Sequence, residues 1–249
     1  MIILKSPEEI EKMAQSCRIV ADTLAYLKDK VKPGITTRDI ERLADDYIIS
    51  NNAKSAFKGY RGYPASICAS VNDEVIHGIP SDRELEEGDI LGVDLGVYKN
   101  GFYGDAAFTF PVGKVHKNAE RLLRVAEESL YIGIQNAVED RRISDISHSV
   151  QRHVEENGYS VVRAFVGHGI GRDLHEDPQI PNFGPPGRGP KIRSGMTIAI
   201  EPMVNEGGYE VVVLDDGWTT VTMDGKLSAH FEHTIVVTPD GPKILTKTD

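Results

Sequence analysis

The sequence predicts an α/β fold in which two similar halves give helices and strands to one shared antiparallel sheet. A pair of amphipathic helices followed by strand-like segments occurs near the N-terminus, and the same order returns about 107 residues later. The segments Gly88–Asp94 and Gly195–Glu201 also match, because each runs from a glycine to a carboxylate in six steps. A chain of 249 residues, 40% of them apolar, can bury a sizeable core without disulfide bonds. We interpret the repetition as an internal duplication.

The first half opens with two predicted helices. Ser6 and Glu9 have the spacing of a capping box, and Pro7 suits the first position of the helix that follows. Apolar residues then recur at the three-and-four spacing of one buried face up to about Val31. A second helix with the same kind of apolar face is predicted over about residues 37–51.

The second half repeats this arrangement. Helices are predicted over about 118–138 and 144–157, and Gly158 ends the second of them. Two ordinary strands could resemble each other by accident, but the common offset of helices and strands favours duplication. We therefore predict a single domain over 1–249. Its internal repeats are expected at about 7–112 and 116–238.

Irregular structure is expected mainly in one place. Residues 177–190 are rich in proline and glycine, which predicts a surface loop near the functional site.

Composition and charge exclude several classes of protein. The formal net charge of −10 disfavours nucleic-acid binding, which needs a basic face. The first residues contain no signal-peptide pattern, and no apolar run approaches the length of a membrane span. Only two cysteines are present, which suits a reducing compartment. We expect a cytoplasmic protein that does not enter membranes.

Four carboxylates interrupt segments that are otherwise apolar, namely Asp94, Asp105, Glu201 and Glu232. A buried carboxylate is costly unless it is paired or binds a metal ion. Taken singly, Asp105 could cap a turn and Glu201 could pair with a lysine or arginine. Taken together, the four favour a metal site, because the duplicated half supplies its carboxylates from the matching strand.

The geometry of the first pair of carboxylates follows from a predicted hairpin. Asn100-Gly101 is a strong two-residue turn signal, and with that turn Gly96 faces Asp105. Asp94 is then a diagonal neighbour of Asp105 on the same face, roughly 7–8 Å away between Cα atoms. Two carboxylates at this spacing can share a cation. Oxygen ligands with one imidazole suit Mn²⁺, Fe²⁺, Co²⁺ or Zn²⁺, and bridging carboxylates favour two ions.

Three of the eight histidines lie in suggestive places. His77 follows a short apolar segment and precedes a glycine. His168 lies between two glycines, where backbone can approach a ligand closely. His175 precedes an acidic Glu-Asp-Pro segment. A single histidine of this kind is usually structural, so none of the three identifies a site alone.

The sequence resembles the methionine aminopeptidases, and the bacterial type I form in particular, in seven ordered segments. These are residues 57–64, 70–80, 88–94, 104–107, 167–178, 200–203 and 231–234. The resemblance implies the "pita-bread" fold, in which pseudo-two-fold halves surround a central antiparallel sheet with helices outside. It also implies metal-dependent removal of the N-terminal methionine from nascent proteins and peptides, with a preference for a small second residue.

The resemblance further implies roles for individual residues. The implied ligands of two divalent metal ions (Co, Mn, Fe or Zn) are Asp94, Asp105, His168, Glu201 and Glu232, with Asp105 and Glu232 bridging the ions. The implied catalytic residues are His77, His175 and Glu201, and the two histidines would also contact the substrate. The implied lining of the methionine pocket is Phe57, Tyr60, Tyr63, Cys68 and Trp218.

Some features depart from the family pattern, and two other functions stay open. Leu174 stands where many relatives have an aromatic residue beside the pocket, so the pocket shape depends on this position. Residues 139–142 replace the usual Lys-Pro-Gly-type turn, which should affect only a loop. An Xaa-Pro aminopeptidase or prolidase on the same fold is one alternative, and a non-catalytic binding protein is the other. We expect a monomer that acts on the N-termini of nascent polypeptides, which it would meet at the ribosome.

Overall fold

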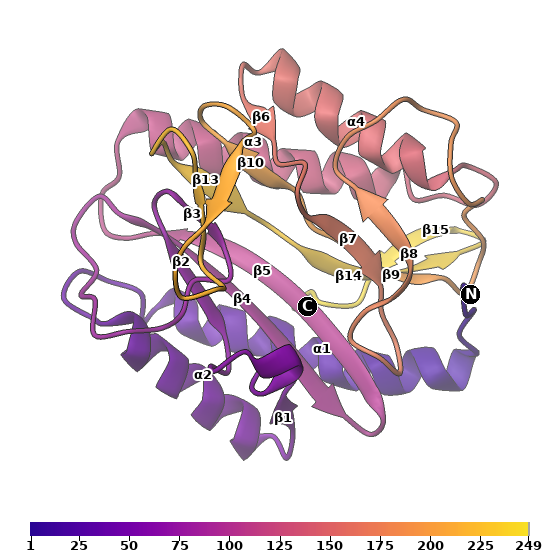
Figure 1. The fold of residues 1–249 in the computed structure, drawn as a ribbon. Coiled ribbons are helices and arrows are strands. Elements are labelled where there is room, and N and C mark those ends of the chain that lie inside the picture. Colours follow the sequence, from indigo (N-terminus) through magenta and orange to yellow (C-terminus); the bar gives the residue numbers. More distant parts are fainter. Residues whose placement is uncertain (249) are drawn as a thin grey trace.

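The computed structural model describes residues 1–248, and its four helices lie in two pairs on the outside of the strands (Figure 1). The first half provides α1 (Pro7–Lys28) and α2 (Thr37–Ser50). The second half provides α3 (Lys117–Gln135) and α4 (Ile143–Glu156). All four predicted helices are therefore confirmed, with ends that differ from the predicted ones by a few residues. None of the helices in this part of the chain is long and apolar enough to cross a membrane.

The start of α1 follows the predicted capping box. The amide of Glu9 donates to the Ser6 hydroxyl at 3.3 Å, and the amide of Ser6 donates to the Glu9 carboxylate at 2.9 Å. Two of the N–H groups that a helix start leaves without partners are satisfied in this way. The direction in which the chain enters α1 is thereby fixed.

The strands pair antiparallel throughout, as predicted, but they form four separate sheets within residues 1–248. The first half contains β1 (Lys54–Ser55), the short 3₁₀ helix η1 (Tyr60–Gly62), β2 (Cys68–Val71), β3 (Glu74–Ile76), β4 (Ile90–Lys99) and β5 (Phe102–Pro111). The second half contains β6 (Ser160–Val161), β7 (Val166–Gly169), β8 (Glu176–Pro181), β9 (Thr197–Ile200) and β10 (Met203–Asn205). It continues with β11 (Val211–Val213), β12 (Thr220–Thr222), β13 (Ser228–His230), β14 (His233–Thr238) and β15 (Gly241–Ile244).

The long hairpin β4–β5 has the predicted register. Asn100 and Gly101 form its turn with φ angles of 52° and 86°, the positive values that a tight hairpin turn requires. Gly96 pairs with Asp105, and Asp94 lies two residues from that pair on the same face. The sequence thus places the first two carboxylates correctly before any tertiary contact is considered.

The two halves meet where the strands carry their acidic residues. The matching strand pair of the second half is β9 and β14, and Glu201 and Glu232 lie just beyond its paired residues. The Glu232 amide donates to the Ala107 carbonyl at 2.9 Å, and the Thr234 hydroxyl donates to the Asp105 carbonyl at 2.7 Å. These bonds join β14 to β5 and bring the carboxylates of both halves together.

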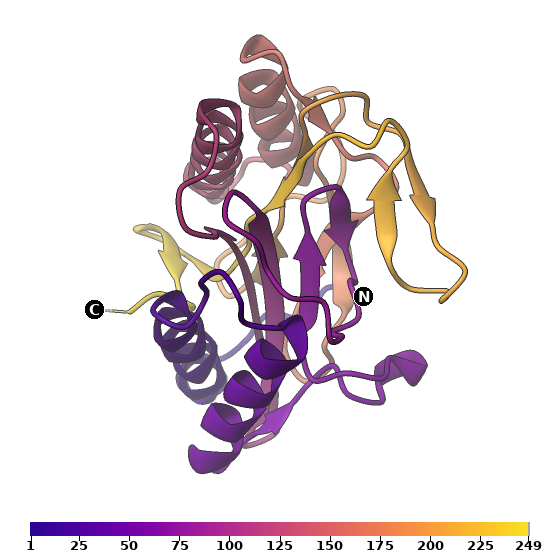
Figure 2. The same ribbon diagram turned by 90° about the vertical axis from the view of Figure 1, so that its left-hand side faces the viewer.

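Each helix pair buries its own apolar core against the strands. The core under α1 and α2 is formed with β4 and β5, and the core under α3 and α4 is formed with β9 and β14. Phe108 packs against both cores. In the view of Figure 2 both helix pairs lie on one side of the strands. These four helices therefore do not cover the opposite face.

The prediction of a loop over residues 177–190 is wrong for its first part. Residues 176–181 form β8, which pairs with β7 at the edge of the five-stranded sheet. Proline lacks an N–H group, but an edge strand tolerates it where no neighbouring strand needs that donor. Pro178 and Pro181 are therefore compatible with an edge strand, although their composition alone predicts a loop.

Close packing of α1 on β5 requires a glycine at position 104. A Cβ atom added there would lie 2.7 Å from the Cys17 amide nitrogen, closer than real Cβ contacts. We expect Gly104→Ala to lower the free energy of unfolding by about 1–3 kcal/mol, because the helix has to shift. Gly92→Ala on β4, where the nearest atom is 3.5 Å away, is the control and should change stability by less than about 1 kcal/mol. Urea denaturation of both variants measures the difference.

Candidate active site

All the predicted site residues line one pocket. Its cavity volume is about 150 Å³. It is lined by Phe57, Tyr60, Arg61, Tyr63, Cys68, His77, Asp94, Asp105, His168, Leu174, His175, Glu201, Trp218 and Glu232. Residues from both halves contribute, so the pocket exists only in the folded chain.

Several carboxylates at one end of this pocket each have a buried oxygen without a hydrogen-bond partner within residues 1–248. Asp105 and Glu232 are 4% and 3% exposed, and one oxygen of each has no hydrogen-bond partner within residues 1–248. One oxygen of Asp94 is also buried without a hydrogen-bond partner in this part of the chain. Burial raises the pKa of Asp94 to about 7, and burial together with neighbouring carboxylates raises the pKa of Asp105 well above its usual range. Such a cluster needs a cation to compensate it.

Glu201 completes the acidic cluster from the second half. It follows β9, and its backbone carbonyl accepts a hydrogen bond from the Asn182 side chain at 3.0 Å. One carboxylate oxygen lies 3.6 Å from Nε2 of His168. Burial, followed by the charge of Asp94, raises the pKa of Glu201 well above its usual range.

His168 is oriented as a ligand by its own backbone. Its Nδ1 lies 2.8 Å from the Gly169 carbonyl oxygen, which can only accept, so Nδ1 carries the proton. Nε2 then presents its lone pair to the cluster, 4.0 Å from Asp105 Oδ2. Burial lowers the pKa of His168 to about 4, which keeps the ring neutral. A hydrogen bond of this kind from the distal nitrogen is typical of metal-ligating histidines.

The residues present fit a divalent metal ion. Ligand atoms of Asp105, His168 and Glu232 lie within 4.8 Å of one another, and all three side chains are buried. Carboxylate oxygens that have no protein donor, together with one imidazole, form a donor set suited to Mn²⁺, Fe²⁺, Co²⁺ or Zn²⁺. The metal-binding prediction is thus supported by the chemistry of the cluster.

His175 lies over the cluster and is held by an aromatic neighbour. Its ring centroid is 4.2 Å from that of His168, and its Nδ1 is 2.9 Å from the Tyr60 hydroxyl. The Tyr60 ring stacks on it with centroids 5.3 Å apart. Partial burial, then the neighbouring His168 and Arg61, lowers the pKa of His175, which favours a neutral ring.

His77 approaches the pocket from the first half. It follows β3 with a φ angle of 60°, which L-amino acids adopt rarely, and this turns its side chain at the end of the strand. Its ring contacts the edge or face of Phe165 at 5.6 Å and of Trp218 at 6.4 Å between centroids. Burial lowers the pKa of His77. The ring therefore lines the pocket and favours its neutral form.

The other end of the pocket is apolar. Tyr63 and Cys68 are 5% and 3% exposed, and Trp218 meets the Tyr63 ring edge-on at 5.1 Å between centroids. The Tyr63 hydroxyl donates to backbone carbonyls of Ile67 and Gly78, so its polar atom is used and its ring remains for packing. An apolar cavity of roughly this size can hold a small organic group.

Arg61 lines the pocket although the sequence had not singled it out. It lies in the turn of η1 with a φ angle of 49°, and its guanidinium is 5.4 Å from the Tyr60 ring centroid. An exposed arginine between Tyr60 and Gly62 resembles any surface turn, so no signal in the sequence distinguishes it. Leu174 also lines the pocket and is 2% exposed, so the departure from the aromatic pattern falls inside the site.

The chain as a whole is similar to known metallopeptidases. Residues 11–239 match the model of metallopeptidase family M24. The methionine aminopeptidase of Clostridium perfringens is 56% identical over 246 residues, which cover 99% of both chains. The crystal structure of the Thermotoga maritima methionine aminopeptidase superposes with a TM-score of 0.98 at 49% identity, covering 100% of both chains. The Pyrococcus furiosus prolidase shares only the fold, with a TM-score of 0.81 at 23% identity over 99% of this chain and 66% of its own.

Proposed function

The chain belongs to metallopeptidase family M24, and we propose that the pocket described above is the site where it performs the reaction of its methionine aminopeptidase relatives. The chain is a metal-dependent aminopeptidase that removes N-terminal methionine. The observation that supports this location most strongly is the set of buried carboxylate oxygens without a hydrogen-bond partner within residues 1–248, beside apolar and aromatic side chains of the same pocket. One end of the pocket suits a cation and the other suits an apolar side chain.

The proposed ligands are the five residues at the acidic end of the pocket, holding two divalent ions of Mn, Fe, Co or Zn. They are Asp94, Asp105, His168, Glu201 and Glu232. Asp105 and Glu232 come from different halves and would be shared by the two ions; each, like Asp94, has one buried oxygen without a hydrogen-bond partner within residues 1–248. When bound, such ions polarise a peptide carbonyl and lower the pKa of an attacking water molecule.

The protein side chains would position the reacting groups and move the proton. The Glu201 carboxylate is proposed to accept the proton of the attacking water and to pass it to the leaving amine. With the Tyr60 hydroxyl donating to Nδ1 of His175, Nε2–H of that ring is left to donate to the carbonyl oxygen as negative charge develops there. His77, which is neutral and lines the pocket, is proposed to contact the substrate backbone from the opposite side.

The methionine side chain is proposed to enter the apolar end of the pocket. Tyr63, Cys68 and Trp218 would surround it, with Phe57 and Tyr60 nearby. A thioether is polarizable and packs well against aromatic edges and sulfur. The residue after methionine would lie between His77 and His175, which leaves room only for a small side chain.

This pocket predicts a specific profile of substrates. Norleucine at the first position should be accepted with a modest penalty, since one mismatched methylene in an apolar pocket is worth about 1–3 kcal/mol. Lysine or aspartate at the first position should fail because a charged group would be desolvated there. Met-Ala, Met-Gly and Met-Ser peptides should be cut, and Met-Lys or Met-Phe peptides should be cut poorly. Values of kcat/KM over this panel, with added Co²⁺ or Mn²⁺, measure the profile.

Two results would contradict the assignment of the pocket. Equal kcat/KM values for small and large second residues would contradict the proposal that His77 and His175 limit the size of that residue. Good turnover of Leu-Ala or Lys-Ala peptides would show that the apolar end does not hold the first side chain. An Xaa-Pro peptide in the same panel tests the related prolidase activity, which we expect to be absent.

We also propose where and on what the enzyme acts. Both cysteines are buried and unpaired, which suits the reducing cytoplasm. The substrates would be N-termini of nascent polypeptides, met by a monomeric enzyme at the ribosome. Analytical ultracentrifugation tests whether the enzyme is a monomer. Co-sedimentation with ribosomes tests whether it meets its substrates there.

A further inference from the structure

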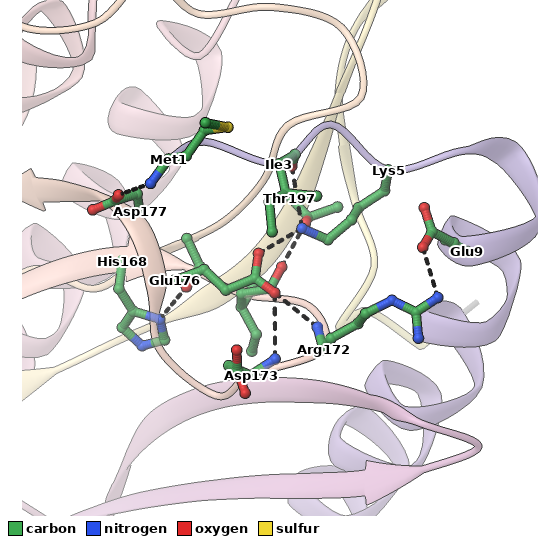
Figure 3. A network of polar contacts seen from close by, with 12 residues as sticks. Met1, Ile3, Lys5, Glu9, His168, Arg172, Asp173, Glu176, Asp177 and Thr197 are labelled. Atoms are coloured by element: carbon green, nitrogen blue, oxygen red, sulfur yellow. Dashed lines mark hydrogen bonds and ion pairs between the residues drawn. The ribbon is translucent and has the colours of Figure 1, made fainter.

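A buried ion pair joins the start of the chain to the segment that carries His175. The Lys5 ammonium lies 2.5 Å from Glu176 Oε2, and the two side chains are 1% and 7% exposed. Figure 3 shows Lys5 reaching inward from the chain before α1, with its ammonium also donating to the Ile3 carbonyl at 3.1 Å. The proposed mechanism gives this pair no part in the reaction.

The other carboxylate oxygen of Glu176 closes a turn of its own segment. Glu176 Oε1 accepts from the amide of Arg172 at 2.8 Å and from the amide of Asp173 at 3.3 Å (Figure 3). One carboxylate therefore binds three donors at once: two amides of the loop and the ammonium of Lys5. A neutral amide of the same shape cannot do this, because it offers one acceptor oxygen and two N–H groups.

Lys5 is itself fixed on both sides. Its amide donates to the Gly195 carbonyl at 2.8 Å, which ties it to the second half of the molecule. The capping box of Ser6 and Glu9 begins α1 immediately afterwards, which ties it to the first half. The ammonium therefore reaches Glu176 from an anchored backbone, and the pair links the loop to both halves.

Contacts of Gly171 also restrain the loop between His168 and Glu176. The pairing of β7 with β8 shifts register here, so the intervening residues leave the ladder. Gly171 packs directly against the pair: a Cβ there would lie 2.2 Å from Lys5 Cε and 2.7 Å from Glu176 Oε1. Its carbonyl accepts from the Tyr103 amide at 2.9 Å, which joins the loop to β5.

Stability alone is a poor reason for such a pair. Taking two charges out of water costs about as much as their attraction returns, and apolar residues of similar volume often serve equally well. A buried charge pair with three fixed donors does determine position, because few alternative geometries satisfy it. The residue that directly precedes Glu176 is His175, whose ring must face the cluster for the role proposed above.

We propose that the Lys5–Glu176 ion pair is a positioning device that holds the 169–176 segment so that His175 faces the metal-ligand cluster. This inference rests on the proposed function, because Glu176 would affect the reaction only through the position of His175. Lys5 and Glu176 are positioning residues and do not touch the substrate. Their loss should affect the transition state more than the binding of substrate, because His175 acts on charge that develops during the reaction.

The central test is Glu176→Gln, measured in two backgrounds. In the otherwise native enzyme we expect kcat on Met-Ala-Ser to fall by about tenfold or more, with KM changed by less than about threefold and metal content unchanged. In a His175→Ala background the same substitution should change kcat by less than about twofold, because the group it positions is already gone. A purely structural role would not produce this dependence on His175.

A second readout needs neither metal nor substrate. The Arg172 and Asp173 amides both donate to Glu176 Oε1, so their hydrogen exchange in metal-free protein should accelerate by about tenfold or more in Glu176→Ala, which removes that acceptor. Arg172→Gln is the matched control, because it removes an exposed ion pair of 3.0 Å with Glu9 from the same loop. That variant should keep kcat within about twofold of the native value.

The double variant Lys5→Met with Glu176→Gln removes both buried charges and serves if the single variant does not fold. We expect its kcat to stay at least about tenfold low even where its thermal stability matches the native enzyme. Native kcat in either variant, or an equal loss in both backgrounds, would overturn the positioning role. Full activity of His175→Ala would instead overturn the proposed role of His175, so the two failures are distinguishable.

Discussion

Asp105→Asn or Glu232→Gln should abolish metal-dependent activity and leave the fold intact. Each carboxylate would bridge two ions, so a single change disturbs two coordination spheres at once. We expect less than about a hundredth of the native kcat on Met-Ala-Ser, a rise of roughly 2.7 kcal/mol or more in the barrier. Metal analysis of the purified variants, alongside kcat, shows whether loss of bound metal accompanies loss of turnover.

The same variants should not be less stable in the presence of a chelator. Burial and the neighbouring carboxylates raise the pKa of Glu232 as they do that of Asp105, which shows that the metal-free cluster is electrostatically unfavourable. An amide in place of one carboxylate removes part of this repulsion. Thermal unfolding with a chelator should therefore give a melting temperature at or above the native value.

Glu127→Gln is the matched control for these variants. Glu127 is a half-buried carboxylate on α3 that lines a groove on the helix side of the molecule, away from the pocket, and burial raises its pKa. Neutralising it should leave kcat close to native. Retention of more than about a tenth of kcat by Asp105→Asn, a barrier change below roughly 1.4 kcal/mol, would refute bridging by that residue.

Local rules predicted the parts of the structure that depend on neighbouring residues. The Asn100-Gly101 turn fixed the register of β4 and β5, and with it the relative positions of Asp94 and Asp105. The four helices followed from caps and apolar spacing for the same reason. Such features are determined within a few residues, so a single sequence contains them.

Contacts between distant segments could not be predicted in this way. Lys5 and Glu176 are 171 residues apart, and the Tyr60 hydroxyl meets His175 across 115 residues. Neither pair has a spacing or residue type that signals the contact. The family resemblance identified His175 as a candidate catalytic residue. The contact of the Tyr60 hydroxyl with its ring is visible only in the folded structure.

The duplication explains why the acidic cluster is symmetric while the rest of the pocket is not. Matching strands of the two halves each supply carboxylates, and the bond from Glu232 to Ala107 joins the strands at that point. Other residues of the pocket come from η1 and from the loop after β7. The repeat therefore predicts the metal-binding carboxylates. It does not predict the proposed substrate contacts, which lie on segments outside the matching strands.

His175→Ala and His77→Ala should separate catalysis from metal binding. If both histidines act on the substrate, each variant should keep its metal and lose about 10²–10³-fold in kcat, the usual cost of removing one donor to a developing oxyanion. KM should change much less than kcat for His175→Ala, since its donor matters mainly in the transition state. His148→Ala, a half-buried histidine on α4 outside the pocket, is the control and should retain native kcat. Metal content and single-substrate kinetics are measured for all three.

Tyr60→Phe gives a finer test of the same role. The substitution keeps the stacked ring at His175 and removes only the hydroxyl 2.9 Å from Nδ1. The imidazole then loses the partner that sets its tautomer, so part of the population would present a lone pair instead of N–H to the carbonyl oxygen. We expect an intermediate loss of about tenfold in kcat, and almost none when His175 is already alanine. Loss of bound metal in the His77 or His175 variant would overturn the division between ligands and substrate contacts. An unchanged kcat in Tyr60→Phe would show that the hydroxyl does not set the orientation of the ring.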